Sequence, residues 1–412
     1  MSLNLSFISK FAVSRILAQI FAVVATLASA RWLGPVAQGE VATTLSWATI
    51  VASLAGLSIG QTIHYLVRSD QKNSSNSLIG TLLTVAIAHG FLGGFAGLSI
   101  YSLLSLDSAI TVPMFCAAIA LCPLIIWEDY LVNITSKLGR LRELAQFQLA
   151  GRLFTLLSMA ILIKGLKLGS QGSIASFVIG GLAVLIYSTR RLVTDHTNFQ
   201  PSLASSLAIS AKWLHLNTIS SLALGQANIL ILAHYGDETD VACYSIANQI
   251  IGVLLWLPQA IVTISYAGIA ECSPDEYWPT HRRLICIGLF ITACFVILSW
   301  LLVPQLLTYI AGPSYFKAGI YFRNLLPCVV GLAFAVLMTP QWISRGLFRL
   351  TASLTFAVGL TSLVASIIQA KIYGVQGIIM VNLAVYSGIV PLSQLTFAIW
   401  CEIRSRESNR TT

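Results

Sequence analysis

Apolar residues follow one another along this chain in long runs, separated by short polar connections. Each run approaches the length of about 20 residues that crosses a hydrocarbon layer of about 30 Å. The runs lack the two-residue alternation of barrel strands, so they predict helices that span a membrane. The twelve runs cover approximately residues 11–30, 42–66, 78–104, 112–134, 144–163, 172–189, 211–233, 242–268, 284–303, 324–344, 351–370 and 377–399.

Composition supports this pattern, because 56% of the residues are hydrophobic and only 9% are charged. A soluble protein of average composition has about 25% charged residues. We therefore predict an all-α polytopic membrane protein, surrounded by membrane lipid. The net charge of +9 does not indicate a nucleic-acid partner, because the basic residues are scattered over loops and form no basic face with interleaved aromatic residues.

The distribution of basic residues predicts the orientation of the chain. If the N-terminus is cytoplasmic, 17 of the 24 Lys and Arg residues lie on the cytoplasmic side and six on the other side. The positive-inside rule then favours cytoplasmic N- and C-termini. Lys10, the first apolar run and the sequence LASA ending at Ala30 also fit a cleaved signal peptide. Removing that run would leave an odd number of helices, so we interpret it as a retained first helix.

A short motif returns in the second half of the chain. The sequence GSQG at 169–172 reappears 205 positions later as GVQG at 374–377, and each copy precedes the last run of a set of six. Gly34, at the end of the first run, has a counterpart 202 positions later in Gly236, at the end of the seventh. The basic turn KLGRLREL after the fourth run likewise matches ISRGLFRL after the tenth.

Three matches in the same order, at nearly equal offsets, predict a parallel internal repeat. The expected architecture is two six-helix bundles, residues 1–200 and 201–412, joined near the polar stretch 195–210. Parallel repeats related by an axis along the membrane normal are typical of transporters, with the substrate between the halves. The class of protein indicated is therefore a transporter that works by alternating access.

The same offset aligns polar residues of the first and seventh runs. Arg15, Gln19 and Thr26 correspond to Asn217, Ser221 and Asn228, and the spacing puts each trio on one helical face. A polar face on a membrane helix must meet protein or water, because lipid offers no partner. We predict that these faces contribute to substrate binding through Arg15, Gln19, Asn217 and Asn228.

Ionisable residues inside the predicted helices are concentrated in the first half, at Arg15, Glu128, Asp129 and Arg152. A charge at the centre of a membrane helix costs about 2.5–3.5 kcal/mol, which makes such residues functional candidates. Arg15 and Arg152 suit an anionic group such as a phosphate, because guanidinium forks match its geometry. Two alternatives remain: either carboxylate neutralises an arginine, or Arg15 extends to the cytoplasmic interface.

Glu128 and Asp129 are consecutive and therefore point about 100° apart around a helix. One of them is expected to pair with an arginine and the other to couple transport to protons or sodium. A further polar and aromatic stripe follows helical spacing in the eighth run and suits sugar hydroxyls and ring stacking, or equally the packing of helices. The stripe contains Ser245, Gln249, Gly252, Trp256, Gln259 and Thr263, of which Gln249, Trp256 and Gln259 are predicted to contact substrate.

Motifs of the common enzyme classes are missing from the sequence. It contains no H-E-x-x-H, no Walker-type G-x-x-x-x-G-K-[ST] and no G-x-S-x-G. We therefore expect no enzyme activity, catalytic residue, cofactor or metal site. A membrane glycan polymerase or acyltransferase would need an acid/base or nucleophilic constellation at one membrane face, and none can be assembled from these residues.

Three stretches of the chain form a recognisable series: ARWLGPVAQGEVA, with Arg31 at its second position, YGDETDVACYSIANQIIGVLLWLPQAIV, and the closing YGVQGIIM. They resemble the Wzx-type polysaccharide flippases of the multidrug/oligosaccharidyl-lipid/polysaccharide exporter superfamily. The similarity extends over nearly the whole chain and rests mainly on the order of individually soft motifs. It implies a MATE-like fold of two six-helix bundles in the bacterial inner membrane.

The resemblance also implies a function, the translocation of an undecaprenyl-pyrophosphate-linked oligosaccharide to the periplasmic leaflet for O-antigen or capsule. A glycan polymerase and a chain-length regulator would be partners. Cavity-lining charges that hold the substrate and couple it to an ion gradient would fall on Arg15, Arg31, Glu128, Asp129 and Arg152. This chain departs from the family pattern in the seventh helix, where Gln226 and Asn228 replace an acidic residue. The alternative on the same fold is an antiporter for organic cations, which should present net acidic groups.

Overall fold

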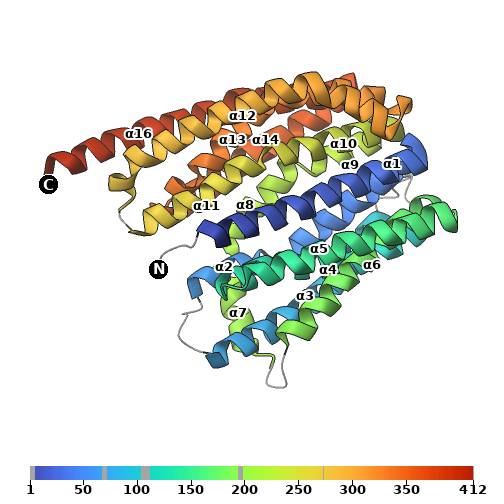
Figure 1. Ribbon diagram of the computed structural model, residues 1–412, viewed down its shortest axis with the longest axis horizontal. Coiled ribbons are helices and arrows are strands. Elements are labelled where there is room, and N and C mark those ends of the chain that lie inside the picture. Colours follow the sequence, from blue (N-terminus) through green and yellow to red (C-terminus); the bar gives the residue numbers. More distant parts are fainter. Residues whose placement is uncertain (1–4, 67–71, 104–111, 194–197, 272, 412) are drawn as a thin grey trace. The chain divides into compact units, whose positions relative to one another are not determined.

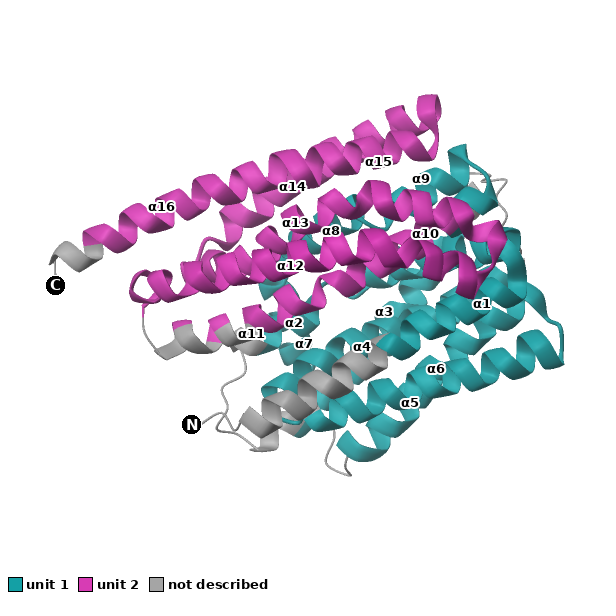
Figure 2. Cartoon of the chain, turned by 45° about the horizontal axis from the view of Figure 1, so that its top comes forward, with its two compact units in different colours: residues 1–242 teal, residues 243–412 magenta. Residues whose placement is uncertain are grey.

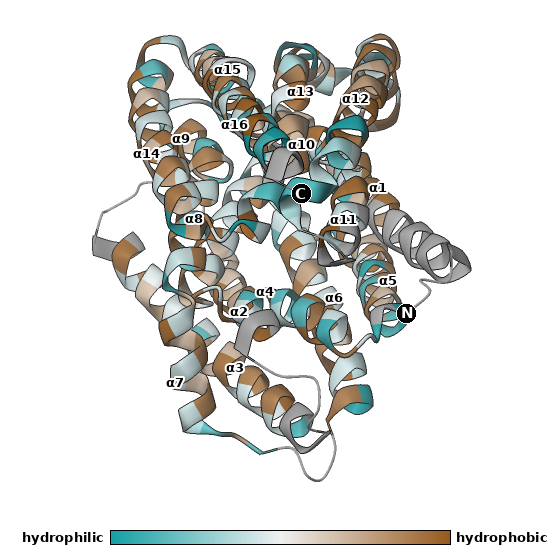
Figure 3. Cartoon of the chain, turned by 90° about the vertical axis from the view of Figure 1, so that its left-hand side faces the viewer, coloured by the Kyte–Doolittle hydropathy of each residue, from teal (hydrophilic) through white to brown (hydrophobic). Residues whose placement is uncertain are grey.

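The computed structural model describes residues 5–66, 72–103, 112–193, 198–271 and 273–411, and every regular element within those ranges is helical (Figure 1). Eleven helices among the described residues are long and apolar enough to cross a membrane. Hydrophobic residues extend along most of them (Figure 3). The predicted all-α class is confirmed. The chain is a multi-pass membrane protein by these criteria.

The chain divides into two compact units, residues 1–242 and 243–412 (Figure 2). The predicted division at 200/201 stays a prediction, because compactness and the boundary of a sequence repeat are different properties. The first unit contains α1 (Leu5–Ala55), α2 (Ile59–Leu66), α3 (Lys72–Leu103), α4 (Val112–Lys137), α5 (Leu141–Met159), η1 (Ala160–Gly165), α6 (Gly169–Leu192), α7 (Pro201–Ser210), α8 (Lys212–Leu224), α9 (Ala227–Tyr235) and the start of α10 (Glu238–Leu254).

The second unit continues α10 and contains the remaining helices, in which two long elements, α12 and α13, follow one another. It contains α11 (Trp256–Glu271), α12 (Pro274–Ala311), the 3-10 turn η2 (Pro313–Tyr315), α13 (Phe316–Ser344), α14 (Phe348–Tyr373), α15 (Val375–Leu383), the π-helical η3 (Ala384–Ile389) and α16 (Val390–Thr411).

The structure differs from the predicted helices at several breaks. The first two predicted runs share α1, which bends at Gly34, where φ is 77° and ψ is 173°. The predicted helix 211–233 is split into α8 and α9, and 242–268 is split at Leu255 into α10 and α11. Pro258 gives a physical reason for the second split, because it cannot donate to the carbonyl four residues before it, where α10 ends.

The polar stretch 195–210 was expected only as a connection, but its second part forms the helix α7. Pro201 stands in the first turn of α7, where its missing N–H is not needed and its fixed φ suits a helix. Leu207 is fully buried against the first unit. The sequence pattern did not predict this helix, because only one of its faces packs against the core.

Two of the three matched pairs of the predicted repeat also have similar local backbone structure. The two basic turns that match in sequence contain Gly139 and Gly346, and their φ angles are 68° and 69°. The two GxQG motifs also stand at helix starts, since α6 begins at Gly169 and α15 follows Gly374. The third matched pair differs, because φ is 77° at Gly34 and −117° at Gly236, so the local structures of the two halves correspond only in part.

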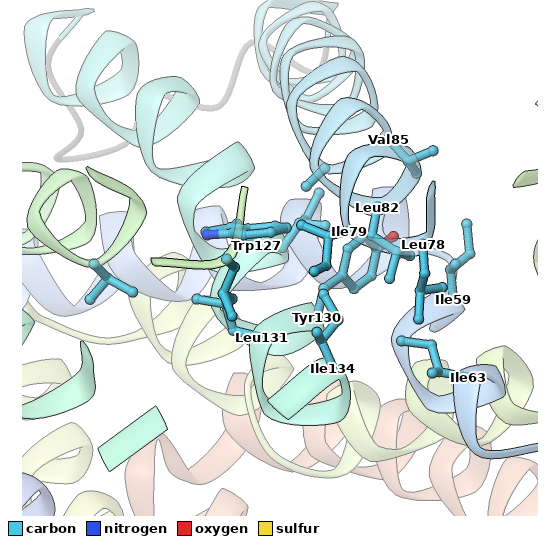
Figure 4. Close-up of a cluster of buried hydrophobic side chains, with 14 of the residues drawn as sticks. Ile59, Ile63, Leu78, Ile79, Leu82, Val85, Trp127, Tyr130, Leu131 and Ile134 are labelled. Carbon is cyan, nitrogen blue, oxygen red and sulfur yellow. The ribbon is translucent and has the colours of Figure 1, made fainter. Parts of the chain in front are cut away.

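The core of the first unit is built around α4 (Figure 4). Trp127, Tyr130, Leu131 and Ile134 of α4 pack against side chains of α2 and α3. Trp127 Nε1 donates to Ser188 Oγ at 2.9 Å, and the Tyr130 hydroxyl donates to the Gly56 carbonyl at 2.8 Å. Between helices in lipid, such packing and buried hydrogen bonds provide the association energy, because lipid is as apolar as the side chains. They fix the rotation of α4 and so the direction in which Glu128 points.

Candidate functional site

A partly open cavity of about 240 Å³ is lined by α1, α4, α5 and α6 of the first unit. Its wall combines aliphatic and aromatic side chains, three glycines and five polar residues. The polar members are Thr49 of α1, Glu128 of α4, and Gln148, Arg152 and Thr155 of α5. The remainder are Leu45, Leu121, Leu124, Ile125, Gly151, Phe177, Gly180, Gly181 and Val184.

Arg152 and Glu128 form an ion pair across this cavity. The distance between Arg152 Nη2 and Glu128 Oε1 is 3.5 Å, and the two side chains are 31% and 30% exposed. That distance is at the outer limit of a hydrogen bond, so the pair is loosely held. The titratable residues of the wall, Glu128 and Arg152, therefore sum to no net charge.

A close crossing of two helices determines where Arg152 emerges. A Cβ added to Gly180 of α6 would collide with the Thr155 side chain and the Gly151 carbonyl oxygen of α5. A Cβ on Gly151 would in turn collide with Val184. Backbones approach this closely only where small residues face each other. Arg152 follows Gly151 directly, so this contact positions the guanidinium group at the cavity.

Asp129 occupies different surroundings from its neighbour Glu128. Its side chain is exposed, and a Cβ added to Gly60 at the start of α2 would lie 3.3 Å from Asp129 Oδ2 and 3.0 Å from Asn133 Nδ2. The two carboxylates thus diverge as their 100° separation predicts. Glu128 meets an arginine, whereas no ion pair of Asp129 occurs among the described residues.

The α2 helix beside Asp129 begins at a break that the sequence did not reveal. Leu57 and Ser58 have φ of 51° and 54°, a left-handed conformation that costs residues with a side chain about 1–2 kcal/mol each. Side chains from neighbouring helices hold the broken backbone. His89 Nδ1 donates to the Ala55 carbonyl at 3.1 Å, and Ser58 Oγ donates to Thr218 Oγ1 of α8 at 2.8 Å.

The structure brings together only part of the predicted site. Two of the predicted residues, Glu128 and Arg152, line the cavity. Arg15 and Gln19 lie in the part of the chain whose side chains the structure does not describe. Elsewhere in the first unit, Arg31 is exposed on α1, Asn217 is half-buried on α8, and Asn228 is buried on α9 with its Nδ2 donating to the Leu224 carbonyl at 3.2 Å.

The predicted stripe of the eighth run crosses the break at Leu255, so its members belong to two helices. Gln249 is exposed on α10, and on α11 Trp256 is half-buried and Gln259 is exposed. All three belong to the second unit. Three further cavity residues, Thr49, Gln148 and Phe177, were not predicted, because single uncharged residues on a membrane helix give no signal of what they face. Among the described residues there is no group of three or more His, Cys, Asp or Glu that could hold a metal ion.

Solved structures of transporters share this fold. One is a multidrug resistance MATE family transporter of the MOP superfamily in an inward-facing conformation, with a TM-score of 0.72, 15% identity, and coverage of 97% of this chain and 99% of that one. Another is a MOP superfamily transporter from Pyrococcus furiosus Vc1 (DSM3638), described as having a binding pocket of reverse polarity that suggests a different function. It has a TM-score of 0.65, 16% identity, and 96% coverage of both chains. At such identities the likeness establishes the fold alone, and the predicted MATE-like fold is confirmed.

Comparison at the sequence level adds little. No family model matches the chain. The glucans biosynthesis glucosyltransferase H of Xanthomonas oryzae pv. oryzae (strain MAFF 311018) is 29% identical over 171 residues, which are 40% of this chain and 24% of that protein. The chain thus corresponds to a small part of that relative.

Proposed function

We propose that this membrane protein flips lipid-linked oligosaccharides, carried on undecaprenyl pyrophosphate, from the cytoplasmic to the periplasmic leaflet of the bacterial inner membrane. The observation that carries the proposal is the electrically balanced cavity of the first unit, where Arg152 is loosely paired with Glu128 at 3.5 Å. A site for organic cations would instead need net negative charge. Here a guanidinium group accompanies the carboxylate, and the wall offers hydrogen-bonding groups to a polar cargo.

Three further observations support the proposal. The fold is that of MATE transporters, and the repeat predicts alternating access between two halves. The motifs ARWLGPVAQGEVA and YGVQGIIM resemble those of polysaccharide flippases. The partial similarity to a protein named for glucan biosynthesis is in keeping with a polysaccharide pathway. In this proposal the termini are cytoplasmic, and a glycan polymerase and a chain-length regulator act on the exported product.

The two neighbouring carboxylates receive different roles in this proposal. Glu128 is engaged by Arg152, whereas Asp129 is exposed and has no ion-pair partner among the described residues. We therefore assign coupling to the proton or sodium gradient to Asp129. The remaining predicted contacts with the cargo stay proposals; they are Arg15, Gln19, Arg31, Asn217, Asn228, Gln249, Trp256 and Gln259.

A second candidate, an antiporter for organic cations, is favoured by one observation. The exposed carboxylate of Asp129 lies beside the broken start of α2 and would attract a cation. Solved structures with this fold include proteins described as multidrug resistance transporters. Efflux of a cationic dye from cells that express the chain separates the two candidates, because a glycan flippase should not alter the dye content.

The test of the proposed function follows lipid-linked glycan in cells that lack the protein. Loss of the protein should leave complete repeat units in the cytoplasmic leaflet, where a membrane-impermeant enzyme added to spheroplasts cannot reach them. The wild-type chain should restore access, and Arg152→Ala should not, at equal membrane abundance. Lipid-linked units that reach the periplasm unpolymerised in the deleted strain would disprove the flippase proposal and favour an enzyme.

A further inference from the structure

The cavity wall presents both hydrogen-bond donors and hydrogen-bond acceptors. Thr49 Oγ1 donates its hydrogen to the Leu45 carbonyl at 2.7 Å, so its oxygen turns only acceptor sites to the cavity. Gln148 has no hydrogen bond to another described residue, so its amide offers donors and an acceptor. The Glu128 carboxylate adds acceptors, and the guanidinium of Arg152 adds donors beyond the one that faces Glu128.

The charge of the cavity argues against an ion as its occupant. A phosphate that approached Arg152 would also approach Glu128, because the two charged groups are 3.5 Å apart. A cation drawn to Glu128 would meet the guanidinium group in the same way. A neutral group that both donates and accepts hydrogen bonds avoids both repulsions. Sugar hydroxyl groups have this property.

The volume of the cavity and its apolar residues both suit a single sugar ring. A volume of about 240 Å³ is below the range of about 300–1,000 Å³ usual for drug-sized ligands, so it admits a single ring-sized group. Phe177 and the aliphatic residues of the wall provide apolar surface. Such surface suits the C–H face of a pyranose, while the polar wall suits its hydroxyl edge.

We infer that this cavity binds one neutral, hydroxylated sugar ring of the cargo and that the anionic pyrophosphate binds elsewhere. This inference rests on the proposed function and refines it, because it removes Arg152 from direct recognition of phosphate. Arg152 and Glu128 act as a matched donor and acceptor pair for the hydroxyl groups. Gln148 and Thr49 contribute to the recognition of the ring and not of the lipid.

The test compares two probes on the purified full-length chain. One is undecaprenyl pyrophosphate carrying a single neutral hexose, and the other is the same lipid without sugar. Binding of each is measured by native mass spectrometry for the wild type, Gln148→Leu and Thr49→Val. Gln146→Leu is the matched control, because Gln146 is an exposed glutamine of the same helix that does not line the cavity.

The wild type should bind the glycosylated lipid more tightly than the bare lipid. Gln148→Leu and Thr49→Val should each reduce that gain by about three- to tenfold, the effect of one hydrogen bond, and leave the affinity for the bare lipid unchanged. Gln146→Leu should match the wild type. Thermal unfolding of each variant shows whether it has folded. If one of the two cavity variants has not folded, the other one tests the inference.

Other outcomes separate the two proposals. If the wild type prefers the glycosylated lipid but both cavity variants keep that preference, the sugar binds elsewhere and the inference is wrong while the flippase proposal stands. Equal loss of both probes in the variants would assign the cavity to the lipid pyrophosphate and also overturn the inference. Equal affinity of the wild type for both probes would show that the protein does not recognise the sugar, and the inference would be wrong. If the wild type binds neither lipid, the proposed function itself fails.

Discussion

Gly169 and Gly374, which lie 205 positions apart in the sequence, have nearly the same positive φ angle, 59° and 57°. Each precedes or opens a helix, α6 and α15 respectively. No atom lies within 4 Å of a Cβ added to either glycine, so space does not explain the choice of residue. The backbone conformation does, because only glycine adopts it without strain.

Alanine at either position should therefore destabilise the protein through the backbone alone. We expect Gly169→Ala and Gly374→Ala each to lower the free energy of unfolding by about 1–3 kcal/mol. Thermal unfolding in detergent measures the change. Gly252→Ala is the control, because Gly252 is helical and also has open space around its Cβ position. A control that loses as much stability as the two variants would refute the backbone explanation.

The ion pair of the cavity predicts a pattern of loss and rescue. Arg152→Glu places two carboxylates together, and Glu128→Arg places two guanidinium groups together, so each should reduce glycan translocation in proteoliposomes by roughly tenfold. Combining the two changes restores one charge of each sign and should recover most of the rate.

A matched exchange at Arg140 and Glu143, an ion pair at the start of α5 outside the cavity, should leave translocation near the wild-type rate. Additive losses in the double variant at Glu128 and Arg152, without recovery, would show that the residues act independently.

The assignment of ion coupling to Asp129 predicts a separation of two activities. Asp129→Asn should make translocation independent of an imposed proton or sodium gradient while exchange of cargo between the leaflets continues. Glu128→Gln should lower translocation but keep its dependence on the gradient. Rates measured in proteoliposomes with and without each gradient test this, and full gradient dependence in Asp129→Asn would exclude Asp129 as the coupling residue.

The second unit contains a more strongly held ion pair. Arg345 Nη1 lies 2.7 Å from Asp275 Oδ1, and the arginine side chain is only 8% exposed. Removing Arg345 would deprive the Asp275 carboxylate, which is 28% exposed, of this charge-assisted hydrogen bond, a loss of about 1.5–3 kcal/mol. Arg345→Ala should thus lower the unfolding temperature of the purified chain markedly.

Arg406 is the control for this change, because its pair with Glu402 is 2.9 Å long but the arginine is 73% exposed. Such surface pairs contribute about 0–1 kcal/mol, so Arg406→Ala should unfold near the wild-type temperature. Equal shifts in the two variants would contradict the role given to burial.

Several features were predictable because they depend on local chemistry. Length and continuity of apolar runs identify membrane helices, since the backbone in lipid has few other ways to satisfy its polar groups. The helix breaks at Ser58 and Gly225 were not predictable. Ser58 adopts a left-handed conformation that its sequence disfavours, and partners from other helices, such as Thr218, maintain it.

The candidate site shows the same division. The angle between consecutive residues was enough to predict that Glu128 and Asp129 would diverge. It did not identify which of them would meet Arg152. That choice depends on the rotation of α4, which Trp127 and Tyr130 fix by packing against other helices, and on the close crossing of α5 and α6 at Gly151 and Gly180.

The sequence alone determined that this protein is a helical membrane protein and predicted an internal repeat, because composition, run length and the recurrence of GxQG are properties of the chain itself. The tertiary structure decided that Glu128 and Arg152 share a cavity with Thr49 and Gln148. The physical reason is distance along the chain: residues 45–184 meet there only after four helices have packed, and the packing depends on side chains that are far apart in sequence.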